Sequence, residues 1–247
     1  MADYINSNIL SQSYVHVEPK WLDGLSPAEK TEKIQEIKTI IEEYAVKRLK
    51  FFLYDDVQVK IEFEEGSIKA KITTYGSICV LLNALTPIGN AIEKYPQYRD
   101  GVKLIVSDVV KAGDMVNSEV VFQTKSKGKS EIISIEARKG IAGSLDKINR
   151  KINEISHKTR SNNENNPSNI LENMFDLHKF IVDLMVNLKG ADDKKAIANA
   201  LLDGVSDINL KKGRFVIGNE IDSQVYESLL RERKNIADFL TEEVKED

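Results

Sequence analysis

The 247-residue chain contains little cysteine and little histidine, and these shortages limit its chemistry. A single cysteine, Cys79, excludes an intramolecular disulfide, a thiolate zinc cluster and a CxxC redox pair, and we interpret it as a buried structural thiol. His16, His157 and His178 show none of the spacings of paired metal ligands. His178 lies on an otherwise apolar stripe, which favours a hydrogen-bonded core or interface histidine over a catalytic base.

Phosphate-binding loops and long apolar runs are also missing. Neither GxxxxGK[ST], GxGxxG nor GxSxG occurs in the chain. The most apolar block, residues 77–92, is interrupted by Asn83, Pro87 and Asn90, and it is shorter than the ~20 apolar residues of a membrane span. Residues 1–13 lack the basic and apolar regions of a secretory signal. We therefore expect a cytoplasmic protein with no membrane span, no metal, no cofactor and no catalytic residues that can be named.

What the chain does contain begins with a β-hairpin, predicted over residues 57–75. Apolar and polar side chains alternate on both arms, and Gly66 lies where the chain must turn. The apolar face of the hairpin is expected to lie against the apolar block 77–92, because an isolated hairpin is only marginally stable in water.

The charged face of this hairpin has two interpretations. The hairpin and the two residues before it offer Asp55, Asp56, Glu62, Glu64, Lys69 and Lys71 as candidate catalytic groups. Carboxylates and a lysine on adjacent strands are what a metal-dependent nuclease uses, but cross-strand ion pairs on a solvated face need the same residue types. We favour the ion pairs.

Apolar residues spaced three and four apart predict helices over most of the remaining chain. Ser26, Pro27 and Glu29 have the order of a capped helix start, and this first helix is expected to run to about Phe52. Gly113 is predicted to allow a tight crossing of two helices. Further helices are expected at residues 77–93, 97–123, 130–158, 171–188, 192–207 and 222–243.

These elements predict a mainly α fold with a small β-hairpin element, of the α+β class. We expect a helical bundle in which the antiparallel hairpin packs on the apolar helix pair 77–123. Residues 161–169 contain five asparagines and Pro167, a composition typical of a linker. The predicted regions are therefore 1–160, with the first helix, hairpin and helical core, and 170–247, with the C-terminal helices.

Two apolar stripes predict contacts between helices. The stripe from Ile141 to Ile155 has heptad spacing over about two heptads, which is short for a coiled coil and fits a helix in a bundle equally well. The predicted interface residues are Ile141, Leu145, Ile148, Ile152, Ile155, Leu171, Met174, Ile181, Met185 and Leu188. We predict a non-enzymatic assembly or interaction protein that forms a homo-oligomer or joins a multi-protein complex.

Charge patterning supports a second hypothesis, the binding of nucleic acid or another polyanion. Residues 125–160 contain ten basic and four acidic residues, whereas residues 220–247 contain four basic and nine acidic ones. The predicted polyanion contacts are Lys125, Lys127, Lys129, Lys147, Arg150 and Lys151. No aromatic residue lies in this segment, so phosphate contacts without base stacking are expected, and nucleic acid is the less favoured partner.

A third hypothesis is an enzyme whose site is assembled from residues that are remote in the sequence.

Overall fold

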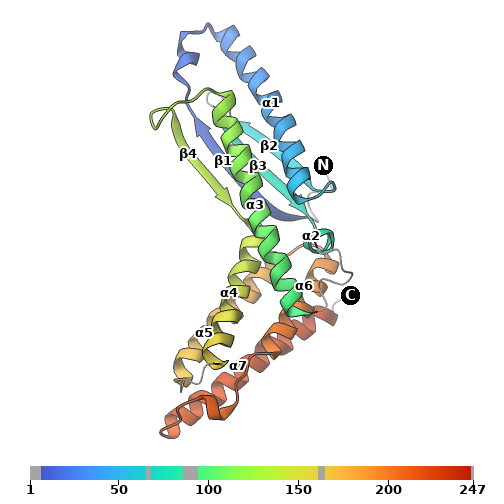
Figure 1. Cartoon of the computed structure of the whole chain (residues 1–247), viewed down its shortest axis with the longest axis vertical. Helices are drawn as coiled ribbons and strands as arrows, with labels where there is room; N and C mark the ends of the chain where they lie inside the picture. Colours follow the sequence, from blue (N-terminus) through green and yellow to red (C-terminus); the bar gives the residue numbers. More distant parts are fainter. Residues whose placement is uncertain (1–6, 65–67, 86–93, 161–164, 246–247) are drawn as a thin grey trace. The chain divides into compact units, whose positions relative to one another are not determined.

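The computed structural model of the protein describes residues 7–64, 68–85, 94–160 and 165–245 (Figure 1). The chain divides into two compact units. Unit 1 comprises residues 1–84 and 104–143, and unit 2 comprises residues 85–103 and 144–247. Helices α3 (Tyr95–Gln123) and α4 (Gly140–Arg160) each contribute to both units. The boundaries between the units therefore lie after residues 84, 103 and 143 and not in the segment 161–169. The mainly helical α+β class is confirmed.

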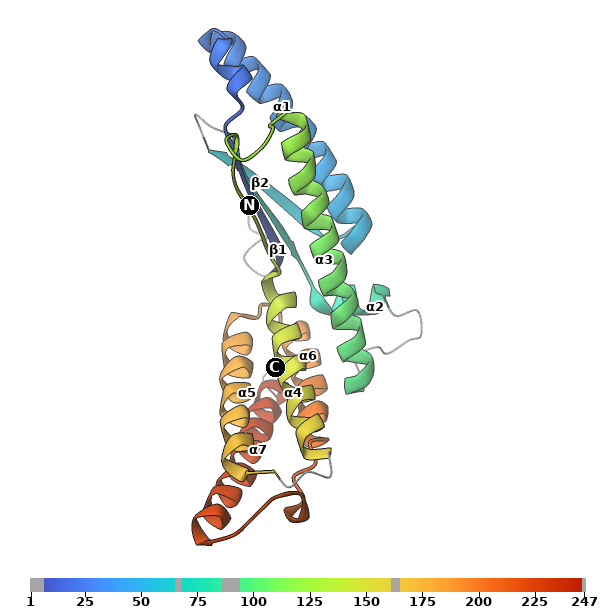
Figure 2. The same ribbon diagram turned by 60° about the vertical axis from the view of Figure 1, so that its left-hand side comes forward.

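Unit 1 is built on a four-stranded antiparallel sheet with the strand order β2-β3-β1-β4. Its other elements are helices that lie between the strands in sequence. Figure 2 shows α1 and α3 on the same face of the sheet. With α2 as an additional helix, the order along the chain is that of a split β-α-β sandwich. The elements are β1 (Asn8–Val17), a 3-10 helix (Lys20–Gly24), α1 (Pro27–Leu53), β2 (Gln58–Glu64), β3 (Ile68–Gly76), α2 (Ile78–Leu85) and β4 (Ile132–Arg138).

The predicted hairpin and first helix are both confirmed. Strands β2 and β3 pair in register, with Ile61 opposite Ile72 and Glu62 opposite Lys71. Helix α1 begins with a capping box, in which the backbone N–H of Ser26 donates to the Glu29 carboxylate at 3.0 Å. The apolar face of the hairpin contacts α1, where Lys38 Nζ lies 5.1 Å from the centre of the Phe63 ring. Residues 86–93 of the expected apolar partner lie outside the described residues.

The helix predicted over residues 130–158 is wrong in its first part, which is strand β4. Ile133 and Ile135 alternate with Ser134 and Glu136, a period of two that the longer helical stripe after it obscures. Gly140 separates strand from helix with φ of +51°, and a Cβ at this position would lie 2.3 Å from the carbonyl oxygen of Ile9. Only glycine fits this junction.

The interpretation of Gly113 is also corrected. A Cβ at Gly113 would lie 3.1 Å from Ser13 Oγ and 3.8 Å from the Cβ of Ala137, so this glycine brings α3 close to the sheet rather than to another helix.

The core of unit 1 lies between the sheet and the two helices. Its buried residues include Val15, Val17, Ile68, Ala70 and Ile72 from the strands and Ile37, Ile41, Leu49, Val109, Val116 and Val120 from the helices.

Unit 2 is a helical bundle, as the apolar periodicity predicted. Helix α7 packs against α5 and α6. The first turn of α3 joins the bundle because the backbone N–H of Tyr95 donates to Asp203 at 2.9 Å, and Gly204 leaves room for the Tyr95 ring. Besides the parts of α3 and α4, the helices are α5 (Pro167–Asn187), α6 (Ala191–Ser206), a 3-10 helix (Lys212–Arg214) and α7 (Glu220–Lys245).

Part of the predicted linker belongs to this bundle. Helix α5 starts at Pro167, and the side chain of Asn166 accepts a hydrogen bond from the backbone N–H of Ser168 at 2.8 Å. Asn165 forms an isolated parallel bridge with Phe215. Residues 161–164 lie outside the described residues. Within the described residues, no helix combines the length and the apolar character that crossing a membrane requires.

Candidate functional site

Helices α1 and α3 lie on one face of the sheet (Figure 2). The strand register and the period of two place polar and aromatic residues of all four strands on the opposite face. We call it the open face. The strand register places Glu62, Lys71, Tyr14 and Glu136 in one row across β2, β3, β1 and β4. The open-face residues are Gln12, Tyr14, His16, Gln58, Lys60, Glu62, Glu64, Lys69, Lys71, Thr73, Tyr75, Ser134, Glu136 and Arg138.

The predicted ion pairs of the hairpin are present on this face. Lys71 and Lys69 lie 3.5 Å and 3.0 Å from the carboxylates of Glu62 and Glu64. Hydrogen bonding from Lys60 is the largest cause of a lowered Glu62 pKa, and the Lys71 charge also contributes. These side chains are well solvated, so water screens each pair and its contribution to the stability of the fold is small. In the described part of the chain, no cluster of three or more histidine, cysteine, aspartate or glutamate residues could hold a metal ion.

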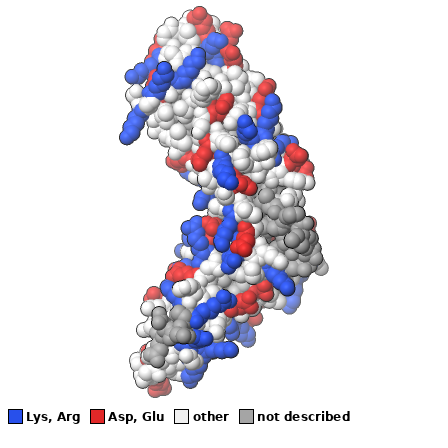
Figure 3. Space-filling model, in the orientation of Figure 1, with Lys and Arg blue, Asp and Glu red and all other residues white. Residues whose placement is uncertain are grey.

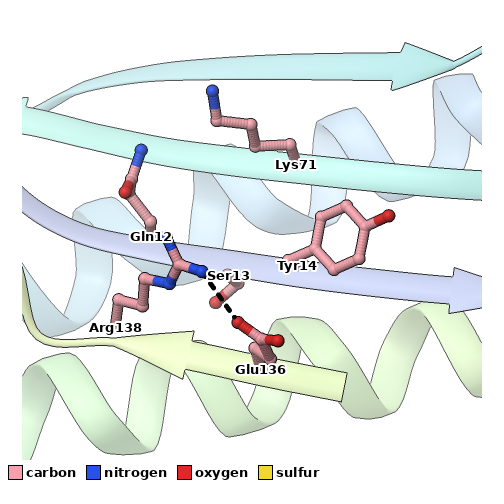
Figure 4. A pocket seen from close by; sticks show the side chains of 6 residues that line it. All are labelled: Gln12, Ser13, Tyr14, Lys71, Glu136 and Arg138. Atoms are coloured by element: carbon pink, nitrogen blue, oxygen red, sulfur yellow. Dashed lines mark hydrogen bonds and ion pairs between the residues drawn. The ribbon is translucent and has the colours of Figure 1, made fainter. Parts of the chain in front are cut away.

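A hollow of about 180 Å³ lies in the middle of the open face, next to the Tyr14 ring (Figure 4). Tyr14 lies between Lys71 on β3 and Glu136 on β4, its direct neighbours in the register. Arg138 Nη2 is 3.0 Å from Glu136 Oε2, and Gln12 Nε2 donates to Thr73 Oγ1 at 3.3 Å. The hollow therefore combines a flat aromatic surface, several hydrogen-bond donors and one carboxylate acceptor.

The two edge strands of the sheet differ in their protection. The edge strand β2 exposes the charged side chains Lys60, Glu62 and Glu64. At the other edge, Ile133 and Ile135 of β4 are 50% and 48% exposed, and the charged side chains of Glu136 and Arg138 are exposed beside them. Among the described residues, β4 pairs only with β1, so one side of its backbone has no neighbouring strand. A charged edge discourages further pairing, whereas an apolar edge favours it.

Most of the predicted interface residues lie inside unit 2. Eight of the ten are buried, while Ile141 and Leu171 are half-buried. Helix α4 packs against α5 within the same chain, as the position of Lys147 Nζ 3.5 Å from the Phe180 ring centre shows. The buried residues are Leu145, Ile148, Ile152, Ile155, Met174, Ile181, Met185 and Leu188.

The predicted polyanion residues fall into two groups in different units. Lys125, Lys127 and Lys129 are exposed in the loop between α3 and β4. The other three belong to α4 in unit 2, and all have partners.

Besides Lys147 on the Phe180 ring, Arg150 pairs with Asp146, and Lys151 Nζ lies 3.2 Å from Asp176. On the face drawn in Figure 3, acidic side chains lie among the basic ones. The cations of α4 therefore do not form a separate basic surface.

His178 and Cys79 were singled out in the sequence. His178 Nδ1 lies 2.5 Å from Glu232 Oε1, and the second oxygen of this buried carboxylate accepts from Asn235 at 3.1 Å. The interpretation of His178 as a hydrogen-bonded histidine is confirmed. Cys79 in α2 is half-buried rather than fully buried.

Sequence reasoning missed the residues of β1 and β4 that meet on the open face. Gln12, Tyr14 and His16 alternate with Ser13, Val15 and Val17, and this period of two was a usable signal for a strand. This signal was weak because two buried positions of β1 hold the polar residues Ser11 and Ser13 instead of apolar ones.

This chain matches no known protein family, no curated protein and no solved structure. The split β-α-β order describes a fold and carries no activity with it, because one fold supports many functions. A function for this chain has to be argued from its own surfaces.

Proposed function

We propose that the protein is a non-enzymatic assembly protein of the cytoplasm that associates with a second copy of itself through strand β4. The observation that carries this proposal is the β4 edge, where Ile133 and Ile135 are half-exposed beside a side of the backbone that no described strand pairs with. An edge strand of this kind is a template for a further strand, because its outward N–H and C=O groups have no partner in the sheet.

The proposed partner is a second copy because β4 is complementary to itself. An antiparallel pair that uses the whole of Ile132–Arg138 has its two-fold axis at Ile135. Ile133 then faces Ala137 of the second copy, and Ser134 faces Glu136. This register brings apolar residues together on the side of α3 and keeps the two Glu136 carboxylates from facing each other.

Charge at the ends of the strand supports the same register. In this register Glu131 and Lys139 of the second copy occupy opposite positions at both ends of the strand, so like charges do not meet there, while the buried Glu131 carboxylate keeps its hydrogen bonds within its own chain. The backbone N–H groups of Lys127 and Lys20 donate to the Glu131 carboxylate at 2.5 Å and 3.0 Å and hold its pKa below the ordinary value. This glutamate is therefore an anion at neutral pH, and Lys139 is exposed.

The proposal keeps the assembly function that the sequence predicts and changes the surface that performs it. The predicted helical stripes are occupied by packing within unit 2. The β4 edge offers backbone groups as well as apolar side chains, and main-chain pairing gives affinity without a long apolar seam.

Light scattering coupled to size-exclusion chromatography tests the proposal. At tens of micromolar the full chain is expected to be a dimer, and the double variant Ile133→Lys/Ile135→Lys a monomer with unchanged circular dichroism. Ile221→Lys is the matched control, because Ile221 is 71% exposed on α7 and belongs to unit 2. A monomeric wild type, or a double variant that stays dimeric, would overturn the proposal.

Cysteine cross-linking tests the register. In a Cys79→Ser background, Ile135→Cys is expected to form a disulfide-linked dimer, because the residue on a two-fold axis faces its own copy. Ile133→Cys faces Ala137 instead and is expected to cross-link much less. Efficient cross-linking of Ile133→Cys with none of Ile135→Cys contradicts this register.

A further inference from the structure

On the open face, aromatic side chains lie next to basic side chains of neighbouring strands: Tyr14 is paired with Lys71, and His16 with Lys69. Its three rings are those of Tyr14, His16 and Tyr75, and its cations are Lys60, Lys69, Lys71 and Arg138. Aromatic rings that lie among basic side chains on an accessible sheet suit unstacked nucleobases, because every base has a π-face that can stack on a ring. The segment 125–160, in which polyanion binding was predicted, has no aromatic residue.

We propose that the hollow beside Tyr14 binds a guanine base of a nucleotide. The Tyr14 ring borders the hollow and offers a surface for stacking, as Figure 4 shows. The polar ends of Lys71, Gln12, Arg138 and Glu136 surround the same space, so they can contact the edge of a base that stacks on the ring. This inference does not depend on the proposed self-association.

The single carboxylate of the hollow selects guanine. A carboxylate accepts hydrogen bonds, and guanine presents two adjacent donors, the ring N1–H and the 2-amino group. The O6 and N7 atoms on the other edge of guanine accept hydrogen bonds from arginine or lysine, and Arg138 and Lys71 supply such donors at the hollow. Adenine and uracil lack this pair of adjacent donors, so they can donate fewer hydrogen bonds to Glu136, which already accepts from Arg138.

Neighbouring rings make a single strand a better ligand than a free nucleotide. His16 lies two residues from Tyr14 on β1, about 7 Å along the strand on the same face. Tyr75 and Thr73 continue the face on β3. A base next to the bound guanine therefore has a second ring within reach, and each stacked base strengthens binding.

The charges of the open face predict how binding responds to salt. Its four cations are nearly balanced by the carboxylates of Glu62, Glu64 and Glu136. Few counterions are released when such a neutral surface meets a phosphate backbone, so affinity is expected to fall only slightly with rising salt. Binding through the lysines of 125–160 would fall steeply instead.

The test is fluorescence anisotropy with the full chain, two labelled RNA octamers and two unlabelled competitors. One labelled octamer has two central guanines among uridines and the other contains uridine alone, while the competitors are GMP and the unlabelled guanine octamer. The guanine octamer is expected to bind more tightly than the all-uridine octamer at low and at high salt. If GMP competes as strongly as the unlabelled guanine octamer, the site binds free nucleotides. If GMP competes more weakly, the site binds single strands. Both outcomes support recognition of guanine.

Variants connect this binding to the hollow. Tyr14→Ala is expected to lower affinity about tenfold or more, whereas Tyr14→Phe keeps the ring and retains binding. Glu136→Gln should reduce the preference for guanine over uridine. Tyr44→Ala is the matched control, because Tyr44 lies on α1 beside Arg48, away from the open face. Circular dichroism and thermal melting establish that each variant folds.

Three results would overturn the inference. The first is equal affinity for the two octamers, and the second is unchanged affinity in Tyr14→Ala with its fold intact. The third is binding that falls steeply with salt and disappears when Lys125, Lys127 and Lys129 are changed to glutamate. That last result would assign binding to the loop between α3 and β4.

Discussion

The two units of this protein use their apolar residues in opposite ways. Unit 2 turns its apolar stripes inward, so that Ile148, Ile152 and Ile181 are buried among helices of the same chain. Among the described residues, unit 1 leaves one face of its sheet without a covering helix and one edge, at Ile133 and Ile135, without a pairing strand. A helix satisfies its own backbone, whereas a sheet ends in strands that still need partners. Surfaces for recognition are therefore expected on the sheet.

Exposed apolar residues occur in both units, and their spacing differs between α5 and β4. In unit 2, Phe175 and Val186 of α5 are exposed, but eleven positions separate them along the helix. In unit 1, Ile133 and Ile135 lie two residues apart on a strand whose outer backbone is unpaired in the described part of the chain. Scattered apolar residues are normal on any surface, while adjacent ones at an open edge favour pairing.

Ile148→Ala asks whether the stripe of α4 is core or interface. Ile148 is fully buried in unit 2, so the loss of its side chain is expected to reduce the free energy of unfolding by about 2–5 kcal/mol. Urea denaturation measures this loss. The molar mass from light scattering should stay that of the wild type, because the stripe packs within one chain. A lower molar mass with little change in stability would place the stripe between chains.

Gly140→Ala probes the junction at which the strand of unit 1 becomes helix α4. The left-handed backbone at φ of +51° and the contact with the Ile9 carbonyl oxygen both oppose a side chain. Gly128→Ala is the matched control, because its φ is +78° and no atom lies within 4 Å of an added Cβ. The control is expected to lose about 1–2 kcal/mol, and Gly140→Ala clearly more. Equal losses in thermal melts would show that the close contact does not matter.

Glu131→Gln tests how unit 1 holds its edge strand at low pH. Hydrogen bonds from the backbone N–H groups of Lys127 and Lys20 lower the pKa of Glu131 below 4.5. A lowered folded-state pKa contributes stability above the unfolded-state value, and this contribution is lost as pH falls through the folded-state value. The melting temperature of Glu131→Gln should therefore fall less than that of the wild type when pH drops from neutral to below 4.5.

Glu36→Gln on α1 serves as the control for this pH series. Its pKa is lowered by Lys33, but the pair is exposed to solvent on both sides. We expect a smaller change in the pH dependence, because water and salt screen such a pair. Identical acid profiles for the wild type and Glu131→Gln would contradict the stabilising role of the Glu131 carboxylate.

The sequence predicted the elements whose signals are local. The capping residues Ser26 and Glu29 placed the start of α1, and alternation within β2 and β3 placed the hairpin. Strand β4 was misassigned, because its short alternation precedes a long helical stripe and Gly140 gives no sign of a positive φ in the sequence. Strand β1 has a weak local signal, since two of its positions that face the helices are the serines Ser11 and Ser13.

The candidate site could not be predicted for a related reason. The side chains of Tyr14, Lys71 and Glu136 come from three strands that are far apart in the chain, and only the strand order β3-β1-β4 makes them neighbours. By itself, the sequence determined helices, hairpin, ion-paired hairpin face and α+β class, because each depends on residues close together in the chain. The tertiary structure decided which stripes are buried, which edge is open and which side chains surround the hollow. These depend on long-range strand pairing and helix packing, which local periodicity does not encode.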